Sequence, residues 1–158
     1  LDLNSQGTLI LPTVPSSKMP TGSVLQVISA TNTNSANGGF LLTTTSTSYV
    51  AVPLAVSITP SSTSSKIMIL VSTVTYRANT SYVTVYRGST NIAGTNGLAS
   101  PTGSSSSRHE PLSFSYLDSP NTTSNVQYTL YARTASGTMY VGGDGDLVNS
   151  ITLMEIQG

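Results

Sequence analysis

The sequence predicts an all-β domain, built as a sandwich or a barrel. Val, Ile, Leu and Tyr recur in short blocks that Gly, Pro, Asn and Ser separate, and this spacing is typical of both architectures. The chain carries 27 Ser and 24 Thr among 158 residues, and the β-branched Thr suits a pleated, half-buried surface. No window combines a helical period with a capping signal, so we expect almost no helix.

The first 21 residues are predicted to be an extended connector or the end of a shaft. Leu9 to Leu11 could make one short strand, but Pro12, Pro15 and Pro20 interrupt any longer ladder because proline has no N–H to donate. Residues 22–158, where the apolar blocks become regular, are predicted to be the β-sandwich domain. The first residue is leucine and not methionine, so we expect either a processed chain or the end of a longer polypeptide, and we favour the second.

Nine strands are predicted within the sandwich domain. Their ranges are Val24–Thr31, Phe40–Thr45, Tyr49–Thr59, Lys66–Arg77, Tyr82–Tyr86, Leu112–Leu117, Val126–Arg133, Thr138–Val141 and Ile151–Ile156. The segment Arg77–Ser81 is predicted to be a hairpin loop between two of these strands.

Alternation assigns side chains to the two faces of a strand. Every second residue from Val126 to Ala132 is apolar, so these residues share one face, as a sheet with one face on the core requires. The run Lys66–Val71 is unbroken apolar sequence after its lysine. It indicates either a central strand that is buried on both faces or a strand whose second face another subunit covers.

Composition excludes several classes of function. Six basic and six acidic residues give zero net charge, which removes the electrostatic attraction that drives binding to nucleic acid or to an anionic membrane surface. No apolar run approaches the roughly 20 residues that span a bilayer. With no cysteine and one histidine, the chain has no disulfide, thiolate site or multi-histidine metal centre. We therefore expect no cofactor and no enzymatic activity.

His109 is the first candidate for catalysis. It lies beside Arg108 and Glu110 and follows the serine run Ser104–Ser107. A Ser–His–carboxylate triad needs a strained nucleophile turn and an acid in reach of the imidazole. Adjacent residues of an extended segment point to opposite faces, so we expect His109 and Glu110 to diverge and His109 to make a surface contact.

Asp144 and Asp146 could present two carboxylates to calcium, with Asn149 or a backbone carbonyl completing the site. The residues after Asp146 do not supply the later ligands of an EF-hand loop, so a solvated turn is the preferred interpretation and no metal is expected. A glycosidase pair could be drawn from these two acids with Asp118 and Glu110, but such a pair needs a defined separation that a sequence does not give.

Eight tyrosines, with two phenylalanines and no tryptophan, form an unusual aromatic set. Packing is the default expectation for those that lie within strands, Tyr76, Tyr86, Tyr128 and Tyr131. Tyr82 and Tyr140 lie beside loops and are expected to be exposed. An exposed tyrosine ring can stack on the apolar face of a sugar while Asn, Asp and Arg bond its hydroxyls.

Three loops are rich in small polar residues. They are Asn34–Gly39, Gly94–Ser107 and Gly142–Asp146. Long loops in small domains are usually functional or disordered.

Five blocks of the sequence, in their order and spacing, resemble a domain at the C-terminal ends of tail-fibre and other virion-surface proteins of tailed bacteriophages, especially marine and cyanobacterial ones. The blocks are Gly22–Val27, Ile58–Ile67, Tyr86–Thr90, Tyr116–Pro120 and Ser150–Ile156. The resemblance covers about residue 22 to the C-terminus. Each block alone is a weak signal of the family, but the five blocks together are fairly specific for it.

The resemblance implies an antiparallel β domain, usually a homotrimer, that contacts a host surface or closes the fibre. A trimer would give Ile67–Val71 a second surface to bury against and would protect strand edges. Within the blocks, Asp118–Pro120 is expected to turn and Arg87 to pair with Asp118 as a structural ion pair. The region between Asn91 and Arg108 matches no block and is where a receptor-reading loop would be expected.

These observations together predict a jelly-roll-like antiparallel β-sandwich trimer on the virion surface. It would be a non-catalytic fibre tip or receptor-binding module that contacts a glycan or protein of the host and is joined to the rest of the fibre or virion. The candidate ligand-binding residues are Asn79, Tyr82, Asn96, Arg108, His109 and Tyr140. The alternative is a capsid-decorating or fibre-assembly protein without a receptor, and a glycan depolymerase comes third.

Overall fold

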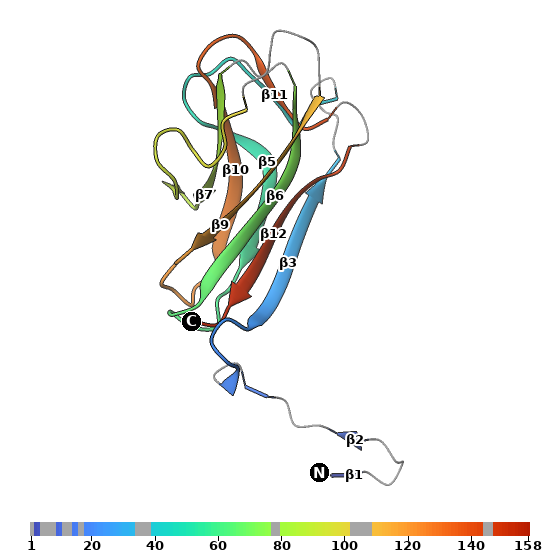
Figure 1. The fold of residues 1–158 in the computed structure, drawn as a ribbon, viewed down its shortest axis with the longest axis vertical. Helices are drawn as coiled ribbons and strands as arrows, with labels where there is room; N and C mark the ends of the chain where they lie inside the picture. The colour runs from blue at the N-terminus through green and yellow to red at the C-terminus, as the bar shows by residue number, and fades with distance from the viewer. Residues whose placement is uncertain are drawn as a thin grey trace.

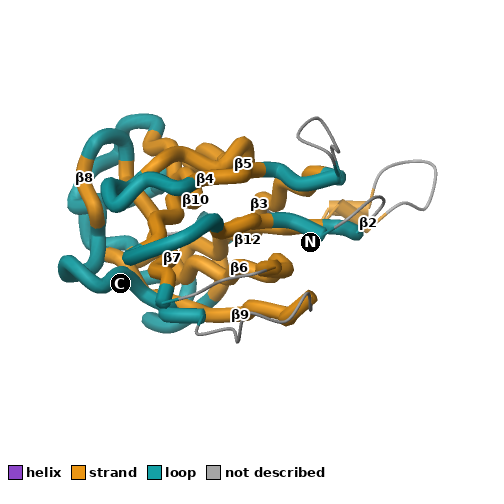
Figure 2. The backbone as a smooth tube through the Cα atoms, turned by 90° about the horizontal axis from the view of Figure 1, so that it is seen from above, coloured by secondary structure: helices purple, strands orange, loops and turns teal. Residues whose placement is uncertain are grey.

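Two antiparallel sheets face each other across one hydrophobic core (Figure 1). The computed structural model describes residues 2–3, 9–10, 14–15, 18–33, 39–76, 80–101, 109–143 and 147–158. The elements of this part of the chain are all strands, and turns and loops join them (Figure 2). The all-β, sandwich-like expectation is therefore confirmed.

The large sheet has the order β3–β12–β6–β11–β4, and β9 pairs with the opposite edge of β6. Its strands are β3 (Val24–Asn32), β4 (Leu42–Thr44), β6 (Lys66–Tyr76), β9 (His109–Asp118), β11 (Met139–Val141) and β12 (Asn149–Ile156). The small sheet has the order β5–β10–β7–β8. Its strands are β5 (Val50–Ile58), β7 (Ser81–Arg87), β8 (Thr90–Asn91) and β10 (Val126–Thr134). A separate short ladder joins β1 (Asp2–Leu3) to β2 (Leu9–Ile10).

All nine strands predicted for the sandwich domain are present, and Leu9–Ile10 forms the short strand expected before it. The predicted hairpin at Arg77–Ser81 is wrong. Strand β6 pairs with β9, β11 and β12, whereas β7 pairs with β8 and β10. The chain therefore crosses between the sheets here, and local turn signals could not reveal this because both flanking strands find their partners far along the sequence.

The core is built by the inward faces of both sheets. In β10 every second side chain from Val126 to Ala132 is buried, as the alternation predicted. In β6 the inward residues Ile67, Ile69 and Val71 are at most 3% exposed. Burial of such side chains contributes about 1.5 to 3 kcal/mol each, so this interface between the sheets supplies most of the stability.

Strand β6 is not buried on both faces within one chain. Leu70, which points to the outside of the large sheet, is 38% exposed. Met68 on the same face is half-buried. The interpretation of β6 as a strand buried on both faces is therefore wrong for the single chain, because the described residues leave Leu70 on its outer face exposed.

One end of the sandwich is joined to the N-terminal segment, and the other end carries a row of aromatic side chains. At one end Gly22 N–H donates to Gln157 O at 2.8 Å and Gln157 N–H donates to Ser23 O at 2.8 Å, which ties the N-terminal segment to the last strand (Figure 1). At the other end the large sheet carries the cross-strand row His109–Tyr76–Tyr140. That aromatic end is therefore the one that faces away from the N-terminal connection.

Candidate functional site

A cluster of tyrosines around one arginine covers the outer face of the small sheet. Strand β10 places Tyr131 and Arg133 on the face opposite to the buried Tyr128, because side chains alternate along a strand. The register pairs Arg133 with Tyr82, and Thr129, on the same face, with Tyr86. We call Tyr49, Tyr82, Tyr86, Tyr131 and Arg133 the tyrosine–arginine cluster.

The aromatic rings of this cluster contact one another. Tyr86 and Tyr131 stack with their centroids 4.0 Å apart. Tyr49 meets Tyr86 edge to face at 6.1 Å. The guanidinium carbon of Arg133 lies 4.0 Å from the ring centroid of Tyr82 and 5.2 Å from that of Tyr49. Each cation–π contact at such a partly exposed position contributes about 0.5 to 1 kcal/mol, so the rings hold the guanidinium in place.

The loop after β8 fixes the same arginine from its other side. Nη2 of Arg133 donates to Thr95 O at 3.2 Å and to Asn96 Oδ1 at 3.5 Å. The Tyr49 hydroxyl donates to Thr95 O at 3.2 Å. Burial raises the pKa of Tyr49, and the hydrogen bond and positive charge of Arg133 offset part of that rise. Tyr49 therefore keeps its proton at neutral pH and remains a donor.

Tyr49 and Arg133 of this cluster border a surface hollow of about 450 Å³. Its lining residues are Thr47, Ser48, Tyr49, Asn91, Thr95 and Arg133. Thr84 Oγ1 donates to Asn91 Oδ1 at 2.7 Å and Ala93 N–H donates to it at 3.1 Å, so the amide of Asn91 has a fixed orientation. The hollow combines the aromatic ring of Tyr49 with hydroxyl, amide and guanidinium groups and falls in the size range of small-ligand sites.

Gly97 sets the position of the loop. It has φ +70°, a left-handed conformation, and its N–H donates to Gly94 O at 2.9 Å. A Cβ at this position would collide with the Val83 carbonyl oxygen and the Tyr49 hydroxyl.

The variant Gly97→Ala is therefore expected to displace Thr95 and Asn96 and to lower the free energy of unfolding by about 1 to 2 kcal/mol. Urea denaturation measures the loss. Gly94→Ala is the control, because nothing lies within 4 Å of its Cβ position. Equal losses for both variants would contradict a special role for the left-handed turn.

A second aromatic cluster lies at the aromatic end of the large sheet. Phe40 packs against Tyr140 at 4.7 Å, Tyr76 at 5.4 Å and His109 at 6.2 Å between ring centroids. Tyr76 lies 4.8 Å from His109 and 5.5 Å from Tyr140. His109 is exposed and pairs with Tyr76 on the outer face, whereas Glu110 pairs with the buried Thr75. The expected divergence of His109 and Glu110 is thus confirmed.

The structure describes four of the six candidate residues, and it places them in two separate clusters. Tyr82 and Asn96 lie in and beside the tyrosine–arginine cluster, and His109 and Tyr140 lie in the second cluster. Asn79 and Arg108 lie outside the described residues, as do Asp144 and Asp146.

The prediction from the sequence missed the outward-facing residues of the tyrosine–arginine cluster. Tyr86 and Tyr131 were expected to pack, and they do so, but with each other on the outside of the small sheet and not in the core. The signal was present in the alternation of β10, since Tyr131 and Arg133 are out of phase with the apolar residues around them. Tyr49 lies close to them only because the folded chain pairs β5 with β10.

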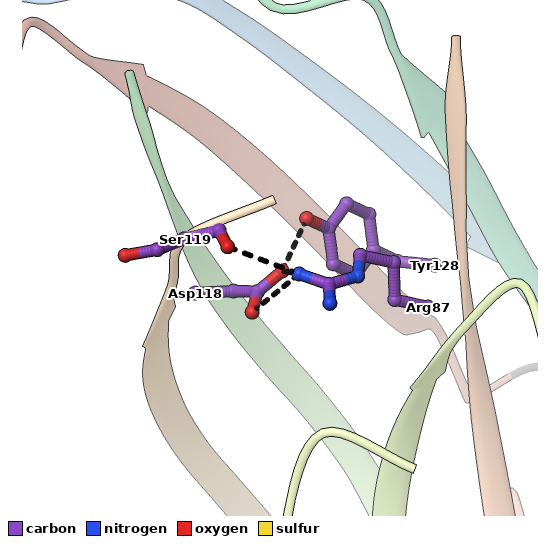
Figure 3. A network of polar contacts seen from close by, with 4 residues as sticks. All are labelled: Arg87, Asp118, Ser119 and Tyr128. Carbon is purple, nitrogen blue, oxygen red and sulfur yellow. Dashed lines mark hydrogen bonds and ion pairs between the residues drawn. The ribbon is translucent and has the colours of Figure 1, made fainter. Parts of the chain in front are cut away.

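The expected ion pair between Arg87 and Asp118 is confirmed, and it links the two sheets (Figure 3). Arg87 Nη1 lies 2.9 Å from Asp118 Oδ2 and 3.0 Å from Oδ1, and it also donates to Ser119 O at 3.2 Å. The buried Tyr128 hydroxyl donates to Asp118 Oδ2 at 2.7 Å. Burial, and then the hydrogen bond to Asp118, raises the pKa of Tyr128 far above its usual value. Asp118 thus faces the interior of the sandwich, where it holds the sheets together.

Within the described ranges no three His, Cys, Asp or Glu side chains gather to hold a metal ion. The same ranges contain no helix that is long and apolar enough to cross a membrane. No protein-family model matches the chain, and no curated protein sequence matches it.

Proposed function

We propose that this chain is a non-catalytic virion-surface protein of a tailed bacteriophage, a trimeric, jelly-roll-like fibre tip or receptor-binding module that contacts a host-surface glycan. The observation that carries the proposal is the tyrosine–arginine cluster beside its hollow. Aromatic faces and oriented polar groups are the two features that sugar recognition needs. The block pattern that resembles fibre-tip domains supports the virion location.

The position of the second cluster fits the same role. His109, Tyr76 and Tyr140 lie at the end of the sandwich opposite to Gly22, where the connector joins. In a fibre tip the connector faces the shaft, so the aromatic end would face the host. The neutral, hydroxyl-rich surface limits non-specific charge attraction and leaves polar contacts to determine specificity.

Replacing Arg133 by alanine is expected to weaken glycan binding at least about tenfold, because a central arginine stacked on aromatic rings is a typical binding hot spot. A glycan array on the purified chain identifies the ligand, and titration calorimetry with that glycan gives the affinity. Gln127→Ala is the matched control, since Gln127 is exposed on the same face of β10.

Full binding by the Arg133→Ala variant would contradict the assignment of this site. Absence of binding to glycans and to host cells by the unmodified chain would instead favour the second candidate, a capsid-decorating or fibre-assembly protein. That candidate is favoured by the exposed apolar side chains on the outer face of the large sheet, including Leu70 and Leu117.

A further inference from the structure

The outer face of the large sheet carries a continuous row of apolar side chains. In register across β9, β6, β12 and β3, the row is Leu117–Met68–Met154–Val27. Leu117 is 43% exposed and Val27 is 54% exposed. Leu70, which is 38% exposed, follows in the next row. Single exposed apolar residues are ordinary, but a row that crosses four strands marks an interaction surface.

A hydroxyl-lined groove of about 400 Å³ runs beside this row. Its lining includes the hydroxyl side chains of Ser72, Ser113, Ser115, Ser150 and Thr152, together with Leu70. Apart from Leu70, the next rows of the sheet consist of small hydroxyl side chains: Ser115–Leu70–Thr152–Ser29 and Ser113–Ser72–Ser150–Thr31. The face therefore has a ridge of large apolar side chains beside a trough of mostly small ones, so the ridge of one copy can pack into the trough of another.

Charge and size also favour another copy of the chain as the occupant. Among the described residues of this face the only Lys, Arg, Asp or Glu is Lys66, at the connector end. Packing two such faces together therefore buries few charges. This matters because burying an unpaired charge costs more free energy than burying any other group. Four strands spaced ~4.8 Å apart and eight residues long give about 500 Å² in projection. With side-chain relief this approaches the ~800 Å² per partner of a stable protein interface.

We propose that the outer face of β9, β6, β12 and β3 packs against further copies of this chain, while the tyrosine–arginine cluster on the other sheet stays accessible. This inference rests on the assembly part of the proposed function, because it names the surface that the trimer buries, and it does not depend on glycan binding. It also gives the apolar run of β6 its second covered face.

Sedimentation equilibrium of the full chain without any glycan tests the proposal. The unmodified chain is expected to have an oligomeric mass, and Leu117→Lys and Val27→Lys should each weaken association at least about tenfold because a charge must then be desolvated. Gln127→Lys, on the outer face of the small sheet, is the matched control and should keep the mass. A monomeric chain, or oligomers that tolerate both lysine variants, would overturn the inference.

A second measurement does not depend on disrupting the surface. The chain has no cysteine, so Ser115→Cys and Gln127→Cys each carry one nitroxide label. Dipolar coupling between copies should be stronger for the Ser115 label than for the Gln127 label. Equal or reversed coupling would overturn the assignment of this face, even if the chain is a trimer. Circular dichroism confirms that each variant is folded, and loss of glycan binding alone would leave these results unchanged.

Discussion

The variant Asp118→Ala is expected to lower the free energy of unfolding by about 3 kcal/mol, the lower part of the range for breaking a buried ion pair. Alanine would leave the Tyr128 hydroxyl, which is fully buried, without its acceptor. It would also remove the carboxylate that binds Arg87. The side chain of Arg87 is 29% exposed, so water compensates part of its loss, and this places the value at the lower end.

Urea denaturation at matched protein concentration measures this loss, because oligomerisation makes apparent stability depend on concentration. Tyr128→Phe is the control, since it removes one hydroxyl and leaves the ion pair, with an expected cost of about 1 kcal/mol. Asp118→Asn, which keeps the shape and an acceptor, should fall between the two. If Asp118→Ala costs no more than Tyr128→Phe, the ion pair does not hold the two sheets together.

The strands and their faces could be predicted because the signals are local. The apolar residues of β10 recur at every second position, and burial in the structure follows the same period. The link between Arg87 and Asp118 could be expected from the block pattern, although 31 residues separate them. The period of the residues themselves indicates the buried face of β10, whereas the resemblance implied the ion pair.

The strand pairing could not be predicted in the same way. The same holds for the tyrosine–arginine cluster. The segment Arg77–Ser81 has the composition of a hairpin loop, yet β6 and β7 belong to different sheets. Tyr49 meets Arg133 because β5 and β10 are neighbours. Such proximity depends on which strands pair across long stretches of chain, and side-chain period carries no information about that choice.

The buried carboxylate of Glu155 provides the second large effect, and its sign depends on pH. Glu155 is 0% exposed at the end of the core where Gly22 bonds to Gln157, and it pairs in register with Ile67 and Gln26. Gln26 Nε2 donates to Oε2 at 2.6 Å, and the N–H and hydroxyl of Ser61 both donate to Oε1 at 2.7 Å. The carboxylate thus ties β12 to β3 and to the connection before β6.

Burial alone would raise the pKa of Glu155, but the hydrogen bonds from Ser61 and Gln26 outweigh it and hold the pKa below its usual value. A folded-state pKa that is lowered means that the unfolded chain binds the proton more readily. The stabilisation is therefore complete above the ordinary glutamate pKa, about 4.3, and is lost as the pH falls through the lower pKa of the folded form.

Glu155→Gln is accordingly expected to lower the free energy of unfolding by about 2 kcal/mol at neutral pH, the scale of hydrogen bonds to a charged group. The difference from the unmodified chain should shrink below about pH 4, because the native glutamate is then becoming neutral as well. Chemical denaturation of both chains between pH 3 and pH 7 would measure it. Ser61→Ala removes one donor, so it should move the loss of stability to higher pH without abolishing it. A difference that stays constant across this range would mean that the side chain stabilises the end of the sandwich by its shape, and not by its charge.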